Sequence, residues 1–357
     1  MKRKPIGCDF LEYDETTNTY VKSAEQAVRD DVEKHHWLQV LRTILRDWRL
    51  YIMIVPMFLV FLFWRYFPMY ELLNCFKDSS QQILEVVERP FVGFYHFKKL
   101  LFGTGAEQTI SQDFWRAFRN TFLLSFYGLC FGFPMPIIIA LFFNEIKSNA
   151  MRSIYQVLTY LPKFMSTVVI TTLLTLLLKP SDTISDPGIV SRFLTFLGLS
   201  QEAANIGLLN DPNYFRAIYE VSGIWETAGY DSIVFFAAVI AVSPTSYEAA
   251  QIDGAGKMAQ MRYVVLPSIL STVIIMLITK IGSLLNIGYE KVYLLTTTGN
   301  RETAEVVSTF AERYGLQMGN DLEATASAAE MMNNVIGMIL VIGANTIARK
   351  ASDVSLY

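Results

Sequence analysis

Six apolar stretches, each close to the length that crosses a bilayer, recur along the chain and constrain its fold more than any other feature. A transmembrane helix needs about 20 predominantly apolar residues. The stretches cover about residues 50–70, 118–143, 154–178, 217–242, 268–289 and 330–347. Buried helices of a large soluble protein are the alternative, but 52% hydrophobic residues and aromatic ends on the stretches argue against it. The chain is expected to be an all-α integral membrane protein with six transmembrane helices.

Basic residues beside the spans indicate the orientation, because short cytoplasmic loops are enriched in Lys and Arg. The basic residues that flank the spans on one side are Arg42, Arg46, Arg49, Lys147, Arg152, Lys257, Arg262, Arg349 and Lys350. With an even number of spans these segments share one side, so both termini are expected in the cytoplasm. The opposite loops also carry basic residues, Lys98, Lys99, Arg116 and Arg119, but long loops count for little.

The residues before the first span, 1–47, form a cytoplasmic N-terminal extension. Ser23 and Gln26 have the spacing of a capping box, and apolar residues from Trp37 to Trp48 recur at helical spacing. Two interpretations remain open for this predicted amphipathic helix: it lies at the membrane interface, or it packs on protein. Residues 48–357 form the six-span domain.

Composition argues against several other functions. The net charge of −3 indicates no nucleic-acid partner, and the three cysteines lie far apart without a CxxC pair, which argues against a zinc site. The segment GAGK at 254–257 looks like part of a phosphate-binding loop, which requires Gly-x4-Gly-Lys-Ser/Thr. Gln251 and Met258 occupy two of the required positions. No metal or nucleotide is therefore expected on this chain, and no HExxH or Gly-x-Ser-x-Gly motif suggests an enzyme.

The longest predicted cytoplasmic loop, Ser243–Pro267, has the pattern of a short helix, a turn and a second helix. Thr245 and Glu248 are spaced for reciprocal capping, and Pro244 suits the helix start. Ala249 and Ala250 leave one face nearly bare, and Gly254 suits a left-handed helix end. Such a helix could dock into a groove on another protein, or it could be an ordinary capped loop that returns the chain to the membrane.

This loop resembles the EAA motif of ABC-importer permeases, EAA-x3-G-x9-I-x-LP. The matching residues are Glu248, Ala249, Ala250, Asp253, Gly254, Ala255, Leu266 and Pro267, with Val264 in place of isoleucine. Other segments resemble carbohydrate importers of the maltose-transporter type, among them "PFVGFYHFKKLL" and "IWETAGYDSIVFFAAVIA". The segment "NIGYEKVYLL" and the end "SLY" resemble a subfamily for oligosaccharides and polysaccharide breakdown products. Phe91, Glu226 and Asp231 depart from the usual residues, which leaves the sugar undefined.

The resemblance covers about residues 48–357 and implies a type I ABC-importer permease fold with a cytoplasmic coupling helix. It implies a non-enzymatic transport subunit in a bacterial cell membrane, forming half of a pathway for oligosaccharides. The implied partners are a second, different permease chain, two ATP-binding subunits on which ATP and Mg act, and a lipid-anchored or periplasmic sugar-binding protein. The residues implied in coupling are Glu248, Ala249, Ala250, Asp253, Gly254, Ala255 and Pro267.

Asp231 and Lys280 fall near the middle of predicted spans, with Glu226 about one turn from Asp231. Each central charge costs about 2.5–3.5 kcal/mol on insertion scales. Asp231 and Lys280 are expected to approach each other near mid-membrane, either within the substrate path or only as a pair that links two spans. The candidate residues of the substrate path are Trp225, Glu226, Tyr230, Asp231, Lys280, Asn286 and Tyr289. Interfacial belts are the alternative for the aromatic ones. An ion-coupled secondary sugar transporter, with protons exchanged at Asp231 and Lys280, is the alternative function.

Two segments of the chain match closely in sequence. "LPKFMSTVVI" spans 161–170 and "LPSILSTVII" spans 266–275, and both begin spans that enter from the predicted cytoplasmic side. The match indicates a shared local geometry and is too short to show a duplication.

Overall fold

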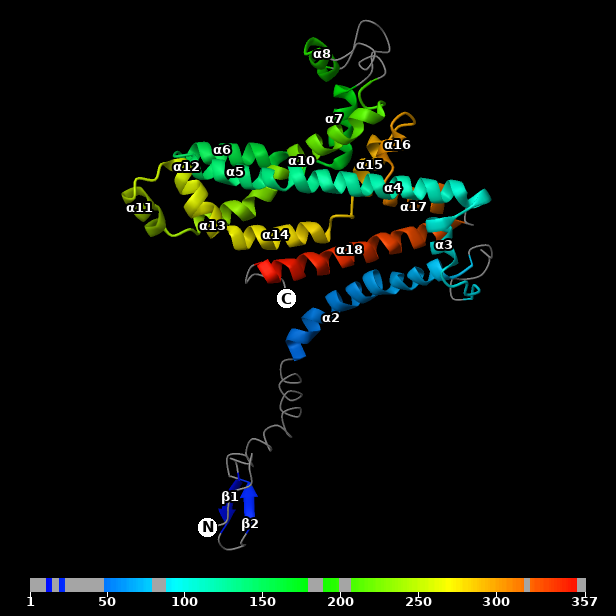
Figure 1. The fold of residues 1–357 in the computed structure, drawn as a ribbon, viewed down its shortest axis with the longest axis horizontal. Helices are drawn as coiled ribbons and strands as arrows, with labels where there is room; N and C mark the ends of the chain where they lie inside the picture. The colour runs from blue at the N-terminus through cyan, green and yellow to red at the C-terminus, as the bar shows by residue number, and fades with distance from the viewer. Residues whose placement is uncertain are drawn as a thin grey trace. The chain divides into compact units, whose positions relative to one another are not determined.

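The computed structural model describes residues 11–14, 19–22, 48–78, 88–178, 189–198, 207–317 and 322–351 (Figure 1). The chain divides into two compact units, Met1–Tyr70 and Glu71–Tyr357. In the first unit, β1 (Leu11–Asp14) and β2 (Thr19–Lys22) pair antiparallel, with Leu11 opposite Lys22. The amphipathic helix predicted before Trp48 lies outside the described residues.

The first predicted span is a continuous helical segment that changes its winding along its length. It consists of α2 (Trp48–Phe61), the π-helix η1 (Leu62–Tyr66) and the 3-10 helix η2 (Phe67–Phe76). Pro56 inside α2 has no N–H to donate to the helix. Tyr51–Phe76 is long and apolar enough to cross a membrane.

Helices make up almost all of the second unit (Figure 1). Its elements are α3 (Tyr95–Phe102), η3 (Gly105–Glu107), α4 (Gln108–Tyr127), η4 (Gly128–Gly132), α5 (Pro134–Glu145), α6 (Asn149–Tyr160), η5 (Leu161–Phe164), α7 (Thr167–Leu177), α8 (Ile189–Phe196), α10 (Pro212–Ile240), α11 (Pro244–Ile252), α12 (Lys257–Gln260), η6 (Met261–Val265), α13 (Leu266–Ser268), α14 (Leu270–Gly282), α15 (Tyr289–Leu295), α16 (Arg301–Ala304), α17 (Val307–Glu312), η7 (Arg313–Gln317) and α18 (Glu323–Ala351). The long rods α4, α5, α10, α14 and α18 run in broadly one direction, with α11 beyond one end and α3, α16 and α17 near the other.

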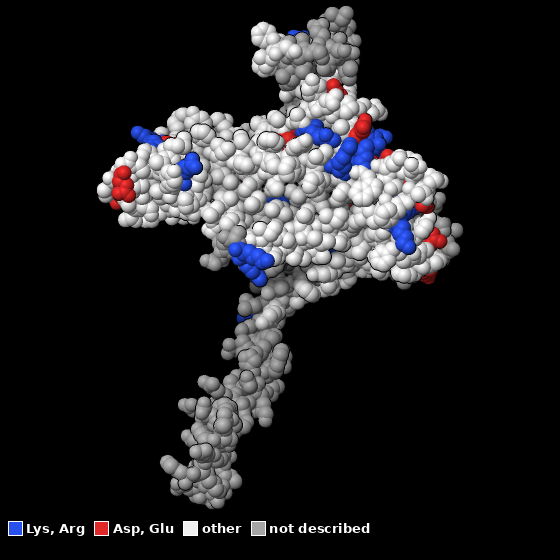
Figure 2. All heavy atoms as spheres, viewed as in Figure 1, with Lys and Arg blue, Asp and Glu red and all other residues white. Residues whose placement is uncertain are grey.

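Within the described residues, three continuous helical segments are long and apolar enough to span a membrane, namely Tyr51–Phe76, Gly105–Glu145 and Glu323–Lys350. Three further spans exist only if bent helix pairs are each counted as one, which gives up to six by length and composition. Figure 2 shows charged side chains in separate groups on the visible face of the second unit, with a mostly uncharged surface between the groups.

The two matching segments both lie at bends, but the bends differ in angle and in backbone conformation. The first bend, of 96°, separates η5 from α7, where Met165 and Ser166 are extended and Ser166 caps α7. The second bend, of 62°, lies at Ile269 between α13 and α14. Each bend follows a Leu-Pro pair. The first bend falls inside the span predicted over 154–178, whereas the second lies at the start of the span predicted over 268–289.

The predicted end of the fifth span is wrong. Helix α14 ends at Gly282, and a turn follows in which the Asn286 N–H donates to the Ser283 carbonyl over 3.0 Å. A Cβ on Gly282 would lie 3.1 Å from Val341 of α18, so the glycine lets the end of α14 approach that helix. Tyr289, expected at the end of the span, instead begins α15.

Burial in the second unit is arranged as expected for a protein in lipid. Large apolar side chains on the outside of α18 are exposed, Ile339 by 60%, whereas Asn333 of the same helix is buried and donates to the Leu285 carbonyl over 3.1 Å. Polar groups inside a membrane protein need internal partners, because lipid offers no hydrogen bonds. Buried polar groups with internal partners and an apolar outer surface therefore support a membrane-embedded fold.

Helix α10 is central to the packing, and it approaches α6 backbone to backbone at Gly229. A Cβ at this position would overlap the Thr159 carbonyl oxygen. Glycine is therefore required here by close approach and not by backbone conformation.

We expect Gly229→Ala to lower the free energy of unfolding by about 1–3 kcal/mol, because overpacking a tight contact forces the backbones apart. Thermal unfolding of the protein in detergent measures the change. The matched control is Gly337→Ala in α18, where an added Cβ meets nothing within 4 Å. Equal stability of the two variants would show that α6 can withdraw from α10 without loss.

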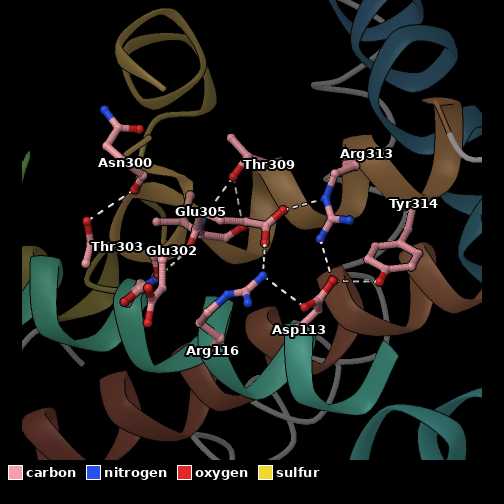
Figure 3. A network of polar contacts seen from close by, with 11 residues as sticks. Asp113, Arg116, Asn300, Glu302, Thr303, Glu305, Thr309, Arg313 and Tyr314 are labelled. Carbon is pink, nitrogen blue, oxygen red and sulfur yellow. Dashed lines mark hydrogen bonds and ion pairs between the residues drawn. The ribbon is translucent and has the colours of Figure 1, made fainter. Parts of the chain in front are cut away.

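A buried network of charges joins α4 to η7 at the end away from α11 (Figure 3). Arg313 donates from Nε to Glu305 over 2.6 Å and from Nη2 to Asp113 over 2.9 Å. Arg116 contacts the same two carboxylates at 3.2 and 2.9 Å, and the Tyr314 hydroxyl donates to Asp113 over 2.8 Å. Two carboxylates therefore balance two guanidinium groups. Arg116, counted in the sequence among loop residues, lies inside α4 and is paired.

His96 of α3 is a buried link to α18. Its Nε2 lies 2.9 Å from the Lys77 carbonyl, which can only accept, and its Nδ1 lies 3.0 Å from the Thr325 hydroxyl. The neutral ring with hydrogen on Nε2 satisfies both contacts. Burial lowers the pKa of His96 below its ordinary value of 6.5, although the contact with the Lys77 carbonyl acts in the opposite direction.

We therefore expect His96 to make the protein less stable, with a lower free energy of unfolding, in acid. The unfolded chain binds a proton at His96 near pH 6.5, whereas the folded chain binds it only at lower pH, so stability falls as pH falls below about 6.5. Thermal unfolding between pH 7.5 and 5.5 measures the fall. A His96→Gln variant, which keeps a donor and an acceptor, should lose less stability over this range. A wild-type protein as sensitive as the variant would contradict the assignment.

Candidate functional site

A cavity of about 560 Å³ lies among the helices of the second unit. Its wall is formed by residues of α4, η4, α5, α7, α10, α14, the turn after α14, and α15. On α10 the lining residues include Glu220, Gly223, Thr227 and Asp231, which recur at spacings of three and four and so share one helix face.

The cavity wall contains an ion pair that the sequence analysis did not predict. The Lys291 ammonium of α15 donates to the Glu226 carboxylate of α10 over 2.9 Å, and their side chains are only 10% and 15% exposed. Lys291 also lies 5.5 Å from the centre of the Tyr219 ring. The pair joins α15 to α10 across the cavity. The sequence analysis missed Lys291 because it placed this residue beyond the fifth span.

Asp231 and Lys280, the two residues expected to approach each other, both line this cavity. The ammonium of Lys280 acts electrostatically on the carboxylates of Glu220 and Asp231, but in the described part of the chain it forms no direct ion pair with either. Lys163 of η5 also acts on Asp231. Asp231 and Lys280 therefore interact electrostatically at a distance and not through a direct ion pair.

The structure separates the seven residues proposed for a substrate path into two groups. Glu226, Asp231, Lys280 and Asn286 line the cavity. The three aromatic residues, Trp225, Tyr230 and Tyr289, are exposed and are not among its lining residues. The ring of Tyr230 contacts Phe164, and that of Tyr289 stacks on Tyr293. An aromatic side chain on the lining is Tyr219, which the sequence analysis did not select.

The candidate coupling residues lie on and just after α11. The N-cap of α11 is Ser243, Pro244 is at the first helical position, and no side chain caps this end. The predicted reciprocal capping by Thr245 and Glu248 is wrong, because the helix begins at Pro244 and Thr245 is already inside its first turn.

The end of α11 has the predicted left-handed glycine, with Gly254 at φ +78°. The Ala255 N–H donates to the Ala250 carbonyl over 2.9 Å, and the Gly254 N–H to the Gln251 carbonyl over 3.0 Å. These two bonds are those of a Schellman motif, which stops the helix and reverses the chain. Asp253 lies between helix and glycine, and Pro267 lies further on, in α13, two residues before the bend at Ile269.

Helix α11 has an inner and an outer face. Tyr247 packs with Leu141, Val239 and Val265, and Ala250 is half-buried on the same side. At about 100° per residue, the exposed residues of the other face fall within an arc of about 100°. They are Thr245, Glu248, Ala249 and Ile252. Ile252 is 87% exposed, which is unusual for an isoleucine at a helix end. The outer face combines a carboxylate, a small side chain and an apolar one.

An ion pair between Lys257 and Glu145 joins the start of α12 to the end of α5. The loop that carries α11 is therefore fixed to the helical bundle on both sides of the turn at Gly254. The described residues contain no group of three or more His, Cys, Asp or Glu side chains that could hold a metal ion.

Comparison with known proteins shows which family the chain resembles. Residues 132–345 match the family model described as "Binding-protein-dependent transport system inner membrane component". The chain is 34% identical over 321 residues to Protein LplB of Bacillus subtilis, covering 90% of this chain and 94% of that protein. It is 35% identical to the polygalacturonan/rhamnogalacturonan transport system permease protein YteP of the same organism, covering 89% and 93% of the two chains.

A solved structure agrees in fold and sequence. The chain aligns with a TM-score of 0.75 and 36% identity to a chain of a bacterial alginate ABC transporter, solved in complex with an alginate pentasaccharide-bound periplasmic protein. The alignment covers 88% of this chain and 99% of that one. The chain therefore belongs to the family of inner-membrane components of binding-protein-dependent transport systems, the permease subunits of ABC importers.

Proposed function

We propose that the chain is the permease subunit of an ATP-driven importer for oligosaccharides, and that its cavity forms half of the translocation pathway. The observation that carries the proposal is a cavity lined by charged and hydroxyl side chains inside a bundle whose outer surface is apolar. Charged groups inside a membrane bundle face one another or a water-filled path. The transport roles given in the names of YteP and of the alginate transporter support a carbohydrate cargo.

The outer face of α11 is the proposed contact with a separate ATP-hydrolysing subunit. Glu248 would meet a basic group there, and Ala249 would let the partner approach closely. Ala250 faces inward and would support Tyr247 instead. Ile252 would add an apolar contact, because burying its exposed side chain against the partner removes apolar surface from water and so favours binding. Gly254 would hold the bend between this helix and α12.

The further partners follow from the family. They are a second permease subunit, a different chain, two ATP-binding subunits on which ATP and Mg act, and a lipid-anchored or periplasmic sugar-binding protein. The bound alginate pentasaccharide of the alginate transporter's periplasmic protein supports the last of these. Both termini and α11 would lie in the cytoplasm, since Lys257, Arg262, Arg349 and Lys350 all flank the spans on that side.

Mild solubilisation of the tagged chain from its native host tests the proposal. A second permease and an ATP-hydrolysing subunit should co-purify, and ATP hydrolysis by the complex should rise when the loaded binding protein is added. A chain that purifies alone, yet transports sugar in vesicles with an ion gradient and no ATP, would favour the secondary transporter. Asp231 and Lys280 would then be the first residues to replace.

A further inference from the structure

The cavity wall presents more hydrogen-bond acceptors than donors; the donors include the side chains of Tyr219, Lys280 and Asn286. The hydroxyls of Thr227, Thr279 and Ser283 donate to carbonyls of their own helices, at Gly223, Ile275 and Lys280 respectively. Each hydroxyl has a single hydrogen, so only acceptor capacity is left toward the cavity. The carboxylates on the wall are acceptors too when ionised. Such a wall suits ligands rich in donors.

The charged side chains on the wall are also more often acidic than basic. Four acidic side chains, Glu220, Glu226, Asp231 and Glu290, face two ammonium groups, Lys280 and Lys291. Lys291 is already paired with Glu226. Lys280 acts on both Glu220 and Asp231, and Lys163 also acts on Asp231, so four acidic groups face three ammonium groups.

Arginine is absent from the described residues that line the cavity. Its planar guanidinium binds carboxylates through two parallel hydrogen bonds, which makes it the usual residue for acidic sugars and other planar anions. Arg116 and Arg313 are held in the network of Figure 3 by Asp113 and Glu305. They are therefore committed to the structure at that end of the bundle.

We infer that the cavity of this chain passes oligosaccharides that are neutral or carry amino groups, and disfavours those built from uronic acids; this inference rests on the proposed function. A uronate residue would bring an acceptor-only anion to a wall that has an excess of carboxylates. Neutral sugars bring hydroxyl donors, and amino sugars bring ammonium groups that the carboxylates attract. The cargo would then differ in charge from alginate, the acidic ligand in the aligned transporter structure.

The field in the cavity can be measured in the purified complex with thiol reagents of opposite charge. Ser283→Cys places a thiol on the wall, and Thr104→Cys places a control thiol in an exposed loop. Both are made with Cys8 and Cys130 replaced by serine, while Cys75 is buried. At each thiol, the measured quantity is the rate of reaction with cationic trimethylammonium-ethyl methanethiosulfonate divided by the rate with the anionic sulfonatoethyl reagent. This ratio should be at least about tenfold higher at Ser283→Cys than at the control thiol. Glu220→Gln with Asp231→Asn should remove most of this preference. Equal reactivity, or a preference for the anion, would overturn the inference.

The cargo itself is identified by uptake. Host cells with and without the chain are given a mixture of arabinan, chitosan and polygalacturonate hydrolysates, and the sugars that disappear are analysed by mass. Uptake of the neutral or amino fraction should depend on the chain. Dependence of the uronate fraction alone would overturn the charge inference and leave the proposed function standing. If no fraction depends on the chain, the proposed function fails and the inference fails with it.

Discussion

Replacement of Glu248 by arginine should abolish transport while leaving the protein inserted and assembled in its fold. Glu248 is exposed on the outer face of α11, so the change removes no internal contact of the described residues. If a basic group of the ATP-hydrolysing subunit meets this carboxylate, the variant places two cations together. Truncating one partner of a buried interfacial charge pair costs about 2–5 kcal/mol, and reversal adds repulsion. Substrate-stimulated ATP hydrolysis and uptake should therefore fall by about thirtyfold or more.

The matched control is Ser246→Arg, which adds the same charge to the same exposed helix about 160° away from Glu248. Both variants should reach the membrane in wild-type amounts, as judged by immunoblot and gel filtration in detergent. Only Glu248→Arg should lose stimulated ATP hydrolysis. Normal stimulation of ATP hydrolysis in Glu248→Arg would show that Glu248 is not part of the coupling contact. Equal loss of stimulated ATP hydrolysis in both variants would show that an arginine anywhere on the exposed surface of α11 disturbs the contact.

Removal of the Lys291 ammonium should cause the second large effect, and this one concerns stability. Lys291→Met leaves the Glu226 carboxylate without its cation at 15% side-chain exposure. Breaking a buried pair by removing one member costs about 3–5 kcal/mol, because the remaining charge is left uncompensated. The variant should unfold in detergent at a clearly lower temperature and accumulate less in the membrane.

A double variant separates the charge from the packing. Glu226→Gln with Lys291→Met removes both charges, and replacing a buried pair by neutral groups is often nearly neutral in stability. The double variant should therefore recover most of the stability lost by Lys291→Met. A double variant as unstable as the single one would show that the alkyl chain of Lys291 or its contact with Tyr219 matters more than the pair. Thermal unfolding of the wild type, the two single variants Lys291→Met and Glu226→Gln, and the double variant completes the cycle.

The sequence predicted the helices and the turn at Gly254 in the loop 243–267 well, for physical reasons that can be stated. Apolar length is a local property, so each of the six stretches is largely helical in the structure. Gly254 was predicted in a left-handed conformation because glycine alone adopts it without strain, and φ +78° confirms it. The Leu-Pro segments were seen to match, but a bend angle of 96° depends on the packing of neighbouring helices.

The cavity was predictable only in part, because it depends on which segments meet. Glu226, Asp231, Lys280 and Asn286 were selected as polar groups at membrane depth, and they line the same cavity. Lys291 was missed because a helix was extended through the turn after Gly282. Ala250 was assigned to the outer face because the sequence does not say where Tyr247 packs. Such errors arise from tertiary contacts and not from local propensity.

The contact between Gly229 and Thr159 has a mechanical consequence for a protein of this class. Two helices whose backbones touch cannot slide past each other without separating, since packed interfaces change between discrete arrangements. Helix α11 follows α10 after only three residues, and α10 carries Glu220, Glu226 and Asp231. A displacement of α11 would therefore move α10 and α6 together as one rigid body. The charged residues that α10 contributes to the cavity wall would move with it.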